Sequence, residues 1–364
     1  MAEPYPTGTE APAAESPPSE PSAAPWRVLL GWPLNVALFG VTLYTTYYVG
    51  GLAYAAALMG ILLAHEMGHY VTARIYRVET SLPYFIPLPF VIGTRGAVIR
   101  MDDRIPDRKS LVAIGAAGPL AGMVVAVPLL FYGLSLSTVA PAVPHMPPLT
   151  EESAWHILSL FIHGGGTAPV AGFMSEGNSI LYWLAKHLVF HLGPGQDVWI
   201  HPVAWAAWIG LFVTALNMIP VGQLDGGHVV FGLFRDRAHP LNDVVRGILI
   251  GLGIAVWAGW LVWAILLTVI LRLSGGRHPP VEKPELPMPR WAKVMSWTSL
   301  VVLVLTFSPA PLRPGMLSAS EARALPPATK QVLGLCDPLI DWREKALAGK
   351  KVGPAPTCPK APGG

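Results

Sequence analysis

Apolar stretches dominate the chain and alternate with shorter polar connections. Most of these stretches reach the roughly 20 residues that a helix needs to cross the hydrocarbon core of a bilayer. The pattern therefore predicts an all-α polytopic membrane protein with about six transmembrane helices. The predicted spans cover residues 28–50, 52–73, 110–133, 203–222, 246–272 and 292–309.

Some connections are predicted to carry structure of their own. Only Gly50 and Gly51 separate the first two spans, which should therefore form a tight helical hairpin. Residues 80–101 are β-branched and aromatic, with interspersed Pro and Gly, so we expect a small β-hairpin or strand insert after the second span. Two short amphipathic segments, 153–163 and 178–192, suit the membrane interface better than a crossing.

Composition agrees with a membrane protein. Of the 364 residues, 52% are apolar and 13% are charged, whereas soluble proteins average about 25% charged residues. The mean hydropathy is +0.47. These values exclude a disordered protein, a coiled coil and an ordinary soluble enzyme. The net charge of +3 gives no indication of a nucleic-acid partner.

The two ends of the chain differ from its middle. Residues 1–27 are rich in Pro and Ala and cannot bury a core, so we expect a disordered segment. This segment lacks the basic start and apolar run of a signal peptide, which favours a prokaryotic plasma membrane as the location. Residues 28–310 form the transmembrane domain. Residues 311–364 form a polar tail with a predicted helix around 337–348.

Basic residues predict the orientation, because cytoplasmic loops of membrane proteins are enriched in Lys and Arg. With six crossings, a cytoplasmic N-terminus puts most basic residues, including those of the tail, on the cytoplasmic side. The loop 272–291 is the misfit, since its basic residues would lie outside. A cytoplasmic tail is kept reducing, so we expect Cys336 and Cys358 to stay unpaired; they would pair only if the tail lay outside.

The most informative motif is His-Glu-Met-Gly-His within the second span. His65 and His69 are four residues apart and therefore share one face of a helix, where two imidazoles form half of a zinc site. Glu66 between them can act on a water at the metal. The alternative is a helix end with polar residues at the membrane interface. Ionisable groups inside an apolar span are costly and usually functional, which favours the metal site.

A second polar cluster, Asn217–His228, ends the fourth span. Its Pro and Gly residues should break the helix, and broken backbone at membrane depth is tolerated where it is buried or lines a wet cavity. Asp225 can supply the third protein ligand that a catalytic zinc requires; its alternative is a helix cap at the membrane surface. The presence of His65 and His69 favours the ligand. We expect His228 to be a packed interfacial residue.

With both motifs identified, the sequence resembles the site-2 proteases, which are zinc intramembrane metalloproteases. His-Glu-x-x-His in one apolar span, with Asn-x-x-Pro-x-x-x-x-Asp-Gly in a later one, is the signature pair of that family. Residues 116–122, 201–227 and 276–280 also resemble family sequence, the last being typical of a branch without a PDZ domain. The likeness covers roughly residues 28–310.

The resemblance implies one Zn²⁺ per chain, held by His65, His69 and Asp225. It implies that Glu66 is the general base and later the proton donor to the leaving amine. Asn217 would hold the scissile carbonyl or the developing oxyanion. The implied partners are the lipid bilayer and membrane-anchored proteins with a transmembrane helix, cut in regulated intramembrane proteolysis. The active site would open to the cytoplasmic side.

A transmembrane substrate helix must unwind locally before cleavage, because its backbone groups are already paired. The segment 80–101 directly follows the span that carries the first motif, so a free strand edge there could receive the unwound substrate as an added β-strand. The alternative is a simple cytoplasmic connector between two helices.

Two other functions stay open. A catalytically silent membrane scaffold could keep the same fold, although a purely structural zinc site does not need Glu66. An ion-coupled transporter could bind its ion at the helix break between Asn217 and Asp225. Transporters usually carry paired broken helices in two related halves, and the sequence contains no second copy of this break.

Overall fold

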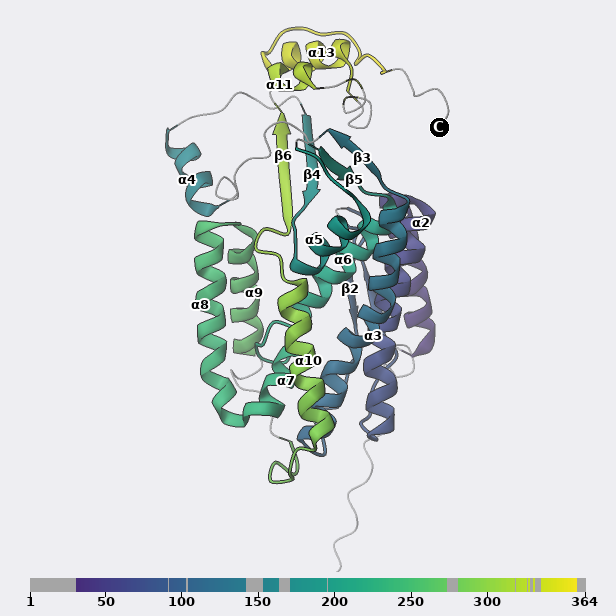
Figure 1. Ribbon diagram of the computed structural model, residues 1–364, viewed down its shortest axis with the longest axis vertical. Coiled ribbons are helices and arrows are strands. Elements are labelled where there is room, and N and C mark those ends of the chain that lie inside the picture. The colour runs from purple at the N-terminus through teal and green to yellow at the C-terminus, as the bar shows by residue number, and fades with distance from the viewer. Residues whose placement is uncertain are drawn as a thin grey trace, which may run out of the picture.

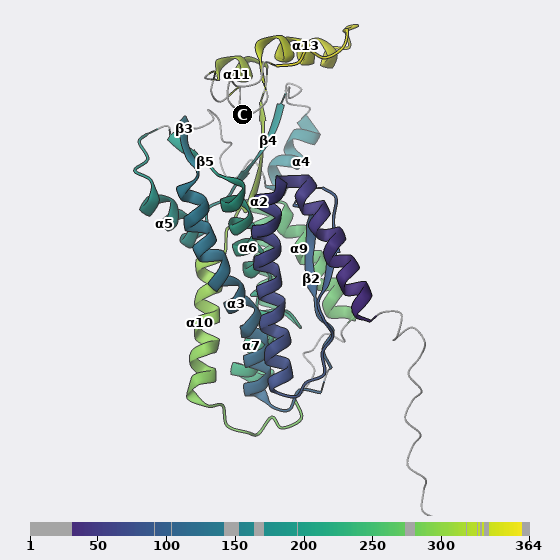
Figure 2. The same ribbon diagram turned by 90° about the vertical axis from the view of Figure 1, so that its right-hand side faces the viewer.

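A computed structural model gives the fold of the chain (Figures 1 and 2). It describes residues 31–90, 92–102, 104–141, 153–163, 171–194, 196–273, 281–317, 319–325, 327, 330 and 335–358. The predicted disordered segment 1–27 and the family-like stretch 276–280 lie outside the described residues.

Helices make up most of the fold and strands are few and short. The helices are α2 (Trp32–Ile75), α3 (Arg108–Ser135), α4 (Ala154–His163), α5 (Ile180–Val189), α6 (Pro202–Asn217), α7 (Asp225–Phe234), the 3-10 helix η2 (Arg235–Ala238), α8 (His239–Ala255), α9 (Gly259–Leu273), α10 (Arg290–Thr306), α11 (Ala319–Ala324) and α13 (Asp337–Leu347). The strands are β1 (Tyr84–Pro87), β2 (Thr94–Val98), β3 (Thr138–Pro141), β4 (Ala171–Glu176), β5 (Gln196–Trp199) and β6 (Leu312–Leu317).

The mostly helical architecture is confirmed. Among the described residues, α2 and α3 are long and apolar enough to cross a membrane, while α5, α6 and α9 are shorter apolar helices. Large apolar side chains such as Tyr48, Leu52, Val124 and Val262 are at least 67% exposed. Such surface is unusual in a soluble protein and suits contact with lipid. The number of six crossings stays a prediction.

Helix α2 is two helices that fold back on each other at Gly51. The backbone of Gly51 has φ 78° and ψ −179°, a conformation that glycine adopts without the steric cost of a Cβ. Figure 2 shows the two halves as a hairpin, as the sequence predicts. We call residues 32–50 the first half and residues 52–75 the second half of α2.

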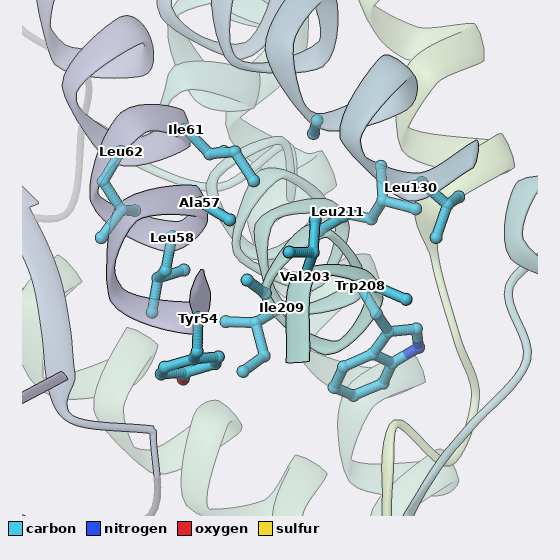
Figure 3. Packing of buried hydrophobic residues seen from close by; sticks show 14 of the residues in the cluster. Tyr54, Ala57, Leu58, Ile61, Leu62, Leu130, Val203, Trp208, Ile209 and Leu211 are labelled. Carbon is cyan, nitrogen blue, oxygen red and sulfur yellow. The ribbon is translucent and has the colours of Figure 1, made fainter. Parts of the chain in front are cut away.

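The main core lies where the second half of α2 meets α3 and α6 (Figure 3). Tyr54, Leu58 and Ile61 of α2 are almost fully buried there, together with Leu130 of α3 and Ile209 of α6. Pro202 begins α6, where a missing N–H costs nothing. Because these three helices pack through one core, the residues that they carry are held in fixed relation to each other.

The predicted β-hairpin in 80–101 is present. Strands β1 and β2 pair antiparallel, with Tyr84 opposite Val98 and Phe85 opposite Ala97. The side chain of Phe85 is 2% exposed. Its ring meets that of Phe39 in the first half of α2 edge to face, with 5.0 Å between centroids.

The structure divides the expected span 246–272 into α8 and α9, which run side by side in Figure 1. Gly253 of α8 faces Leu261 of α9, and Gly259 faces Trp257 in the connection between the two helices. A Cβ on Gly253 would lie 2.6 Å from Leu261 Cγ, and a Cβ on Gly259 would lie 2.1 Å from the Trp257 ring. Trp260, 1% exposed, fills the core of this pair.

The tail after α10 is folded onto the rest of the chain. Strand β6 pairs antiparallel with β4, and the tail residue Leu317 belongs to a buried cluster that contacts Trp199 of β5. In Figures 1 and 2 the tail lies at the end of the molecule that holds β3 and β5, opposite residues 281–289, which precede α10. The predicted helix near 337–348 is present as α13.

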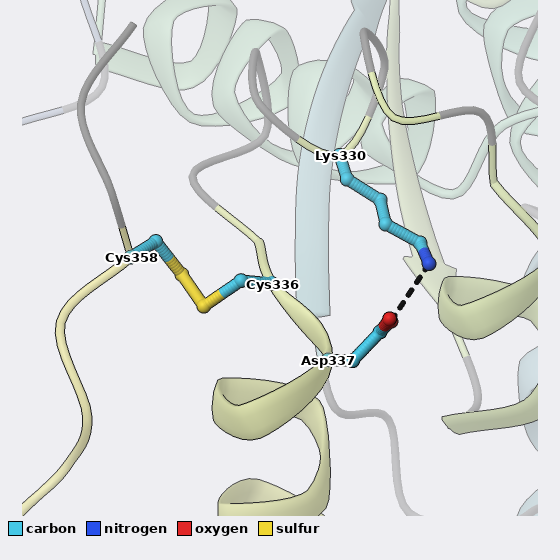
Figure 4. Close-up of a disulfide and its surroundings, with 4 residues drawn as sticks. All are labelled: Lys330, Cys336, Asp337 and Cys358. Atoms are coloured by element: carbon cyan, nitrogen blue, oxygen red, sulfur yellow. Dashed lines mark hydrogen bonds and ion pairs between the residues drawn. A yellow bond between two sulfur atoms is a disulfide. The ribbon is translucent and has the colours of Figure 1, made fainter.

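The expectation of unpaired cysteines is wrong. Cys336 and Cys358 form a disulfide across 22 residues, with 5.6 Å between their Cα atoms (Figure 4). Beside it, Lys330 Nζ donates to Asp337 Oδ1 at 2.7 Å. The earlier expectation followed from a cytoplasmic tail. That expectation counted residues 246–272 as one span, and the structure has two helices there.

Candidate metal centre

Three elements bring the predicted site residues together. His65, Glu66 and His69 lie in the second half of α2, and Asn217 is the last residue of α6. Asp225 is the first residue of α7, directly after the helix break that its Pro and Gly neighbours predict. Residues separated by about 150 positions in the sequence therefore meet at one point in the core.

The ligand-type atoms converge within contact distance. Asp225 Oδ2 lies 3.3 Å from His65 Nε2 and 3.2 Å from His69 Nε2. The two Nε2 atoms are 3.2 Å apart. His65 is 3% exposed and His69 is 6% exposed. Of the groups of His, Cys, Asp and Glu that could hold a metal, the described residues contain this one set.

The chemistry of this set fits a metal ion. His69 Nδ1 lies 2.8 Å from the Ile114 carbonyl oxygen, which can only accept, so Nδ1 donates and the Nε2 lone pair faces Asp225. Asp225 Oδ2 is buried and accepts no hydrogen bond within the described part of the chain. Two imidazole nitrogens and a carboxylate oxygen directed at one another suit a shared cation. Two His and one carboxylate are also a ligand set of catalytic zinc.

Two further polar groups border the convergence point. Asn217 Nδ2 lies 3.2 Å from His65 Nε2. Glu66 is 5% exposed and lines the same cavity as the three ligand-type residues. The structure therefore brings together all five residues that the sequence singles out.

Helix α3 supports the two histidines with glycines. A Cβ on Gly118 would lie 2.0 Å from His69 Nε2, and a Cβ on Gly122 would lie 3.3 Å from His65 Nδ1. Only a residue without a side chain allows α3 to pass this close to His69. The sequence marked the stretch 116–122 through family resemblance alone. Its contacts with the two histidines explain why positions 118 and 122 are glycine.

The break between α6 and α7 is held in shape by contacts of its own. Gly222 adopts φ +57°, and its N–H donates to Asn242 Oδ1 of α8 at 3.2 Å. A Cβ on Gly226 would lie 2.0 Å from the Met218 carbonyl oxygen. Asn242 is 9% exposed. The chain can thus double back tightly enough for Asp225 to face the histidines.

A cavity of about 210 Å³ opens beside the convergence point. Its lining combines the five polar residues with Ala97, Val98 and Ile99 from the segment of the β-hairpin, and with residues of the helix break. His228 also lines it and packs against α3, where a Cβ on Gly115 would lie 2.7 Å from His228 Cβ. His228 thus packs against α3 at the cavity wall, and its expected position at the membrane interface stays a prediction.

Sequence reasoning missed Asn242. Asn242 lies beside Asp243 near the start of α8 and gives no spacing signal. Its contact with Gly222 depends on how α8 returns against the helix break. No local sequence pattern distinguishes Asn242 from its polar neighbours.

Comparison with known proteins gives a family match over the part of the chain that contains these site residues. Residues 53–259 match Peptidase family M50. This range contains α3, both motifs and the helix break, and it includes Asn242.

Among curated proteins, the chain is similar to the "Probable zinc metalloprotease EGY1, chloroplastic" of Arabidopsis thaliana, with 32% identity over 255 residues. That alignment covers 70% of this chain and 42% of the relative. The protein of the same name from Oryza sativa subsp. japonica is 31% identical over 259 residues, covering 70% of this chain and 40% of the relative. The chain thus spans about two fifths of the length of these relatives.

Proposed function

Because the chain belongs to Peptidase family M50, as its resemblance to the site-2 proteases indicates, we propose that it is an intramembrane zinc endopeptidase. Its substrates are membrane-anchored proteins, cut in or near a transmembrane segment during regulated intramembrane proteolysis. The observation that carries this proposal is the convergence of His65, His69 and Asp225 beside Glu66 at a cavity inside the helical core.

In this proposal His65 and His69, through Nε2, and Asp225, through Oδ2, hold one Zn²⁺. A zinc ion at such a site makes water more acidic and polarises a carbonyl. The Ile114 carbonyl keeps His69 in the tautomer that offers Nε2. Burial of His65 and His69 excludes competing water from their imidazoles.

Glu66 takes the proton of the attacking water and later delivers it to the nitrogen of the leaving amine. It is the carboxylate in the cavity that is left over once Asp225 serves as a ligand. Asn217 Nδ2, close to His65, donates to the oxygen of the scissile carbonyl as negative charge develops there. Both groups lie on helices packed through one core, which keeps them in place for the reaction.

The β2 edge offers the substrate a place to bind. Ala97, Val98 and Ile99 line the cavity, and β2 has one partner strand, β1, among the described strands. An unwound substrate segment can add to the free edge of β2 through backbone hydrogen bonds. This would hold the scissile peptide extended and accessible next to Glu66.

The orientation that we propose keeps the N-terminus and the opening of the metal centre in the cytoplasm of a prokaryotic cell, with the chain in the plasma membrane. It differs from the sequence prediction in the tail. The return of the chain through α8 and α9 and the Cys336–Cys358 disulfide support a tail on the outer side. The basic residues Lys283 and Arg290 then fall on the cytoplasmic side, which removes the misfit in the loop 272–291, while the basic residues of the tail move to the outer side.

The decisive experiment compares the wild type with Glu66→Gln. Both proteins are purified in detergent, their zinc content is measured, and cleavage of a panel of single-span membrane proteins is followed. We expect about one zinc in each, because Glu66 is not a ligand. Cleavage should be lost in the variant by at least 100-fold, the lower end of what a general base contributes.

Other outcomes separate the alternatives. Zinc in the wild type without cleavage of any panel member would favour a silent scaffold of this fold. An ion-dependent transport activity without zinc would favour the transporter. Absence of zinc from a folded wild type would contradict the metal site itself. A Glu66→Gln pull-down then identifies substrates that bind but are not released by cleavage.

A further inference from the structure

The first half of α2 contains polar side chains that the proposed chemistry does not use. Asn35 and Thr45 are each 8% exposed, and Thr46 is fully buried. Polar groups inside a membrane-spanning helix are costly unless they make contacts that matter. These three point towards the β1–β2 hairpin or into their own helix.

Asn35 and Thr45 bind the backbone of the hairpin. Asn35 Nδ2 donates to the carbonyl oxygens of Leu82 at 3.0 Å and Pro83 at 2.9 Å, directly before β1. Thr45 Oγ1 lies 2.7 Å from the carbonyl oxygen of Gly93, directly before β2. The two side chains therefore hold the backbone at the start of both strands.

The second half of α2 adds a third contact on the same side. Tyr54 Oη donates to the Ile92 carbonyl oxygen at 2.8 Å. The turn is pressed against the helix backbone, since a Cβ on Gly93 would lie 2.6 Å from Thr46 Cα. Gly93 also has φ +83°. Both the close approach to Thr46 and this backbone conformation therefore favour glycine at position 93.

The same hairpin borders the metal centre. Ala97, Val98 and Ile99 line the cavity that contains Glu66 and Asp225. Hydrogen bonds from α2 thus hold the hairpin at the start of each strand and at its turn. The end of β2 lies at the cavity. A two-stranded hairpin is at best marginally stable by itself, so its placement depends on these contacts with α2.

We propose that Asn35, Thr45 and Tyr54 are positioning residues. They fix the β1–β2 hairpin so that the edge of β2 holds the backbone of the substrate at a set place relative to Glu66. This inference rests on the proposed function for its role in cleavage. The placement of the hairpin itself can be measured without cleavage.

The test uses side chains of similar shape that cannot donate. Asn35→Leu, Thr45→Val and Tyr54→Phe each remove the contacts with the hairpin. Thr46→Val is the matched control, because the Thr46 hydroxyl contacts the Thr42 and Leu43 carbonyls of its own helix. Thr45 also contacts the Thr42 carbonyl, so the pair of threonine variants differs chiefly in the bond to Gly93.

The first measurement is amide hydrogen exchange of residues 84–98 in the zinc-loaded, full-length protein in lipid nanodiscs. One lost hydrogen bond should raise the exchange of the hairpin about fivefold. Asn35→Leu loses two hydrogen bonds, so its hairpin should exchange faster than that of Thr45→Val. The hairpin of Thr46→Val should exchange at the wild-type rate. Zinc content should stay unchanged in all four, because none of these side chains contacts a ligand.

The second measurement is cleavage of a single-span substrate. We expect kcat/KM to fall in the order in which exchange rises, and to stay at the wild-type value in Thr46→Val. Wild-type exchange in the Asn35→Leu, Thr45→Val and Tyr54→Phe triple variant would overturn the positioning role, whether or not the protein is a protease. Raised exchange with undiminished cleavage would overturn its role in substrate binding. Failure of the wild type to cleave would instead count against the proposed function.

Discussion

Gly118 and Gly122 control how closely α3 approaches the two histidines of α2. Alanine at 118 puts a Cβ within 2.0 Å of His69 Nε2, so either the imidazole or the helix must move. We expect Gly118→Ala to lower zinc affinity by about tenfold or more, the effect typical of disturbing the support of a metal ligand. Competition with a chelator in detergent measures this affinity.

Two other glycines give the control for this prediction. Gly122→Ala brings a Cβ to 3.3 Å from His65 Nδ1, so a smaller loss should follow. Gly60 has nothing within 4 Å of an added Cβ, and Gly60→Ala should leave zinc affinity unchanged. Equal affinity in all three variants would show that α3 does not constrain the histidines.

Asn242 gives a second prediction at this scale. Asn242→Leu leaves the Gly222 N–H without its acceptor, and an unsatisfied buried donor costs about 1–3 kcal/mol. The helix break should loosen and zinc affinity should fall by tenfold or more. Asn242→Asp retains an acceptor oxygen and should keep more of the affinity. If both variants bind zinc equally weakly, the hydrogen bond is not what holds Asp225 in place.

The ligand-type residues were predictable and their supports were not, for a physical reason. His65, His69 and Asp225 stand out because polar groups are rare and costly in apolar spans. Gly118 and Asn242 act only through contacts between segments far apart in the sequence. Their roles depend on how helices approach each other, which no local pattern encodes.

At the scale of elements, α3 begins at a well-formed cap. Asp107 Oδ1 accepts hydrogen bonds from the Ser110 N–H at 2.9 Å and the Ser110 hydroxyl at 2.8 Å. Burial raises the pKa of Asp107, but these bonds and the charge of Lys109 outweigh it, so its net pKa lies below the ordinary value. The charged cap therefore stabilises the fold above the pKa of the unfolded chain.

This stabilisation is lost as pH falls through the lowered pKa of the folded protein. We expect Asp107→Ala to lower the free energy of unfolding by about 1 kcal/mol near neutral pH. Asp107→Asn keeps a capping side chain without the charge. Its stability relative to the wild type should therefore improve from about pH 4 downwards. Thermal unfolding across this pH range measures both effects, and a constant difference between wild type and Asp107→Asn would contradict the charged cap.

The hairpin tests the proposed route of the substrate. Neighbouring N–H groups along a strand point to opposite edges. Of the two substitutions Val98→Pro and Ile99→Pro, one therefore removes an N–H from the free edge and the other removes an N–H that faces β1. The variant that loses the free-edge donor should cleave membrane substrates at least fivefold more slowly with normal zinc content. Hydrogen exchange of β1 identifies the other variant, which breaks the pairing. Undiminished cleavage in both would exclude strand addition.

Some elements followed from local sequence and others from packing. The turn at Gly51, the hairpin in 80–101 and the break before Asp225 are all marked by Gly or Pro, which act locally. The division between α8 and α9 has no Pro, and its glycines, Gly247, Gly251, Gly253 and Gly259, do not single out one turn. The division depends on Trp260 and its neighbours filling a core shared by the two helices. Because the hydropathy pattern contains no sign of this packing, it predicts one span.

At the scale of the whole molecule, that division decides where the tail lies. In the proposed topology α8 and α9 are two crossings, which agrees with the position of β6, α11 and α13 at the end of the molecule that holds β3 and β5 (Figure 1). The contact of the tail with Trp199 fits this arrangement. The disulfide between Cys336 and Cys358 requires an oxidising compartment in an ordinary cell. Both observations favour the outer side.

The tail can therefore be located by its thiols. In intact cells, a maleimide that cannot cross the membrane should not label Cys336 or Cys358 until an impermeant reductant is added, and should then label both. Closing a loop across 22 residues contributes about 3 kcal/mol, so Cys336→Ser with Cys358→Ser should destabilise the tail by roughly this amount. Zinc content should stay at the wild-type value, since the tail supplies none of the proposed ligands. Labelling only after permeabilisation would return the tail to the cytoplasm, and labelling of intact cells without reductant would contradict the disulfide.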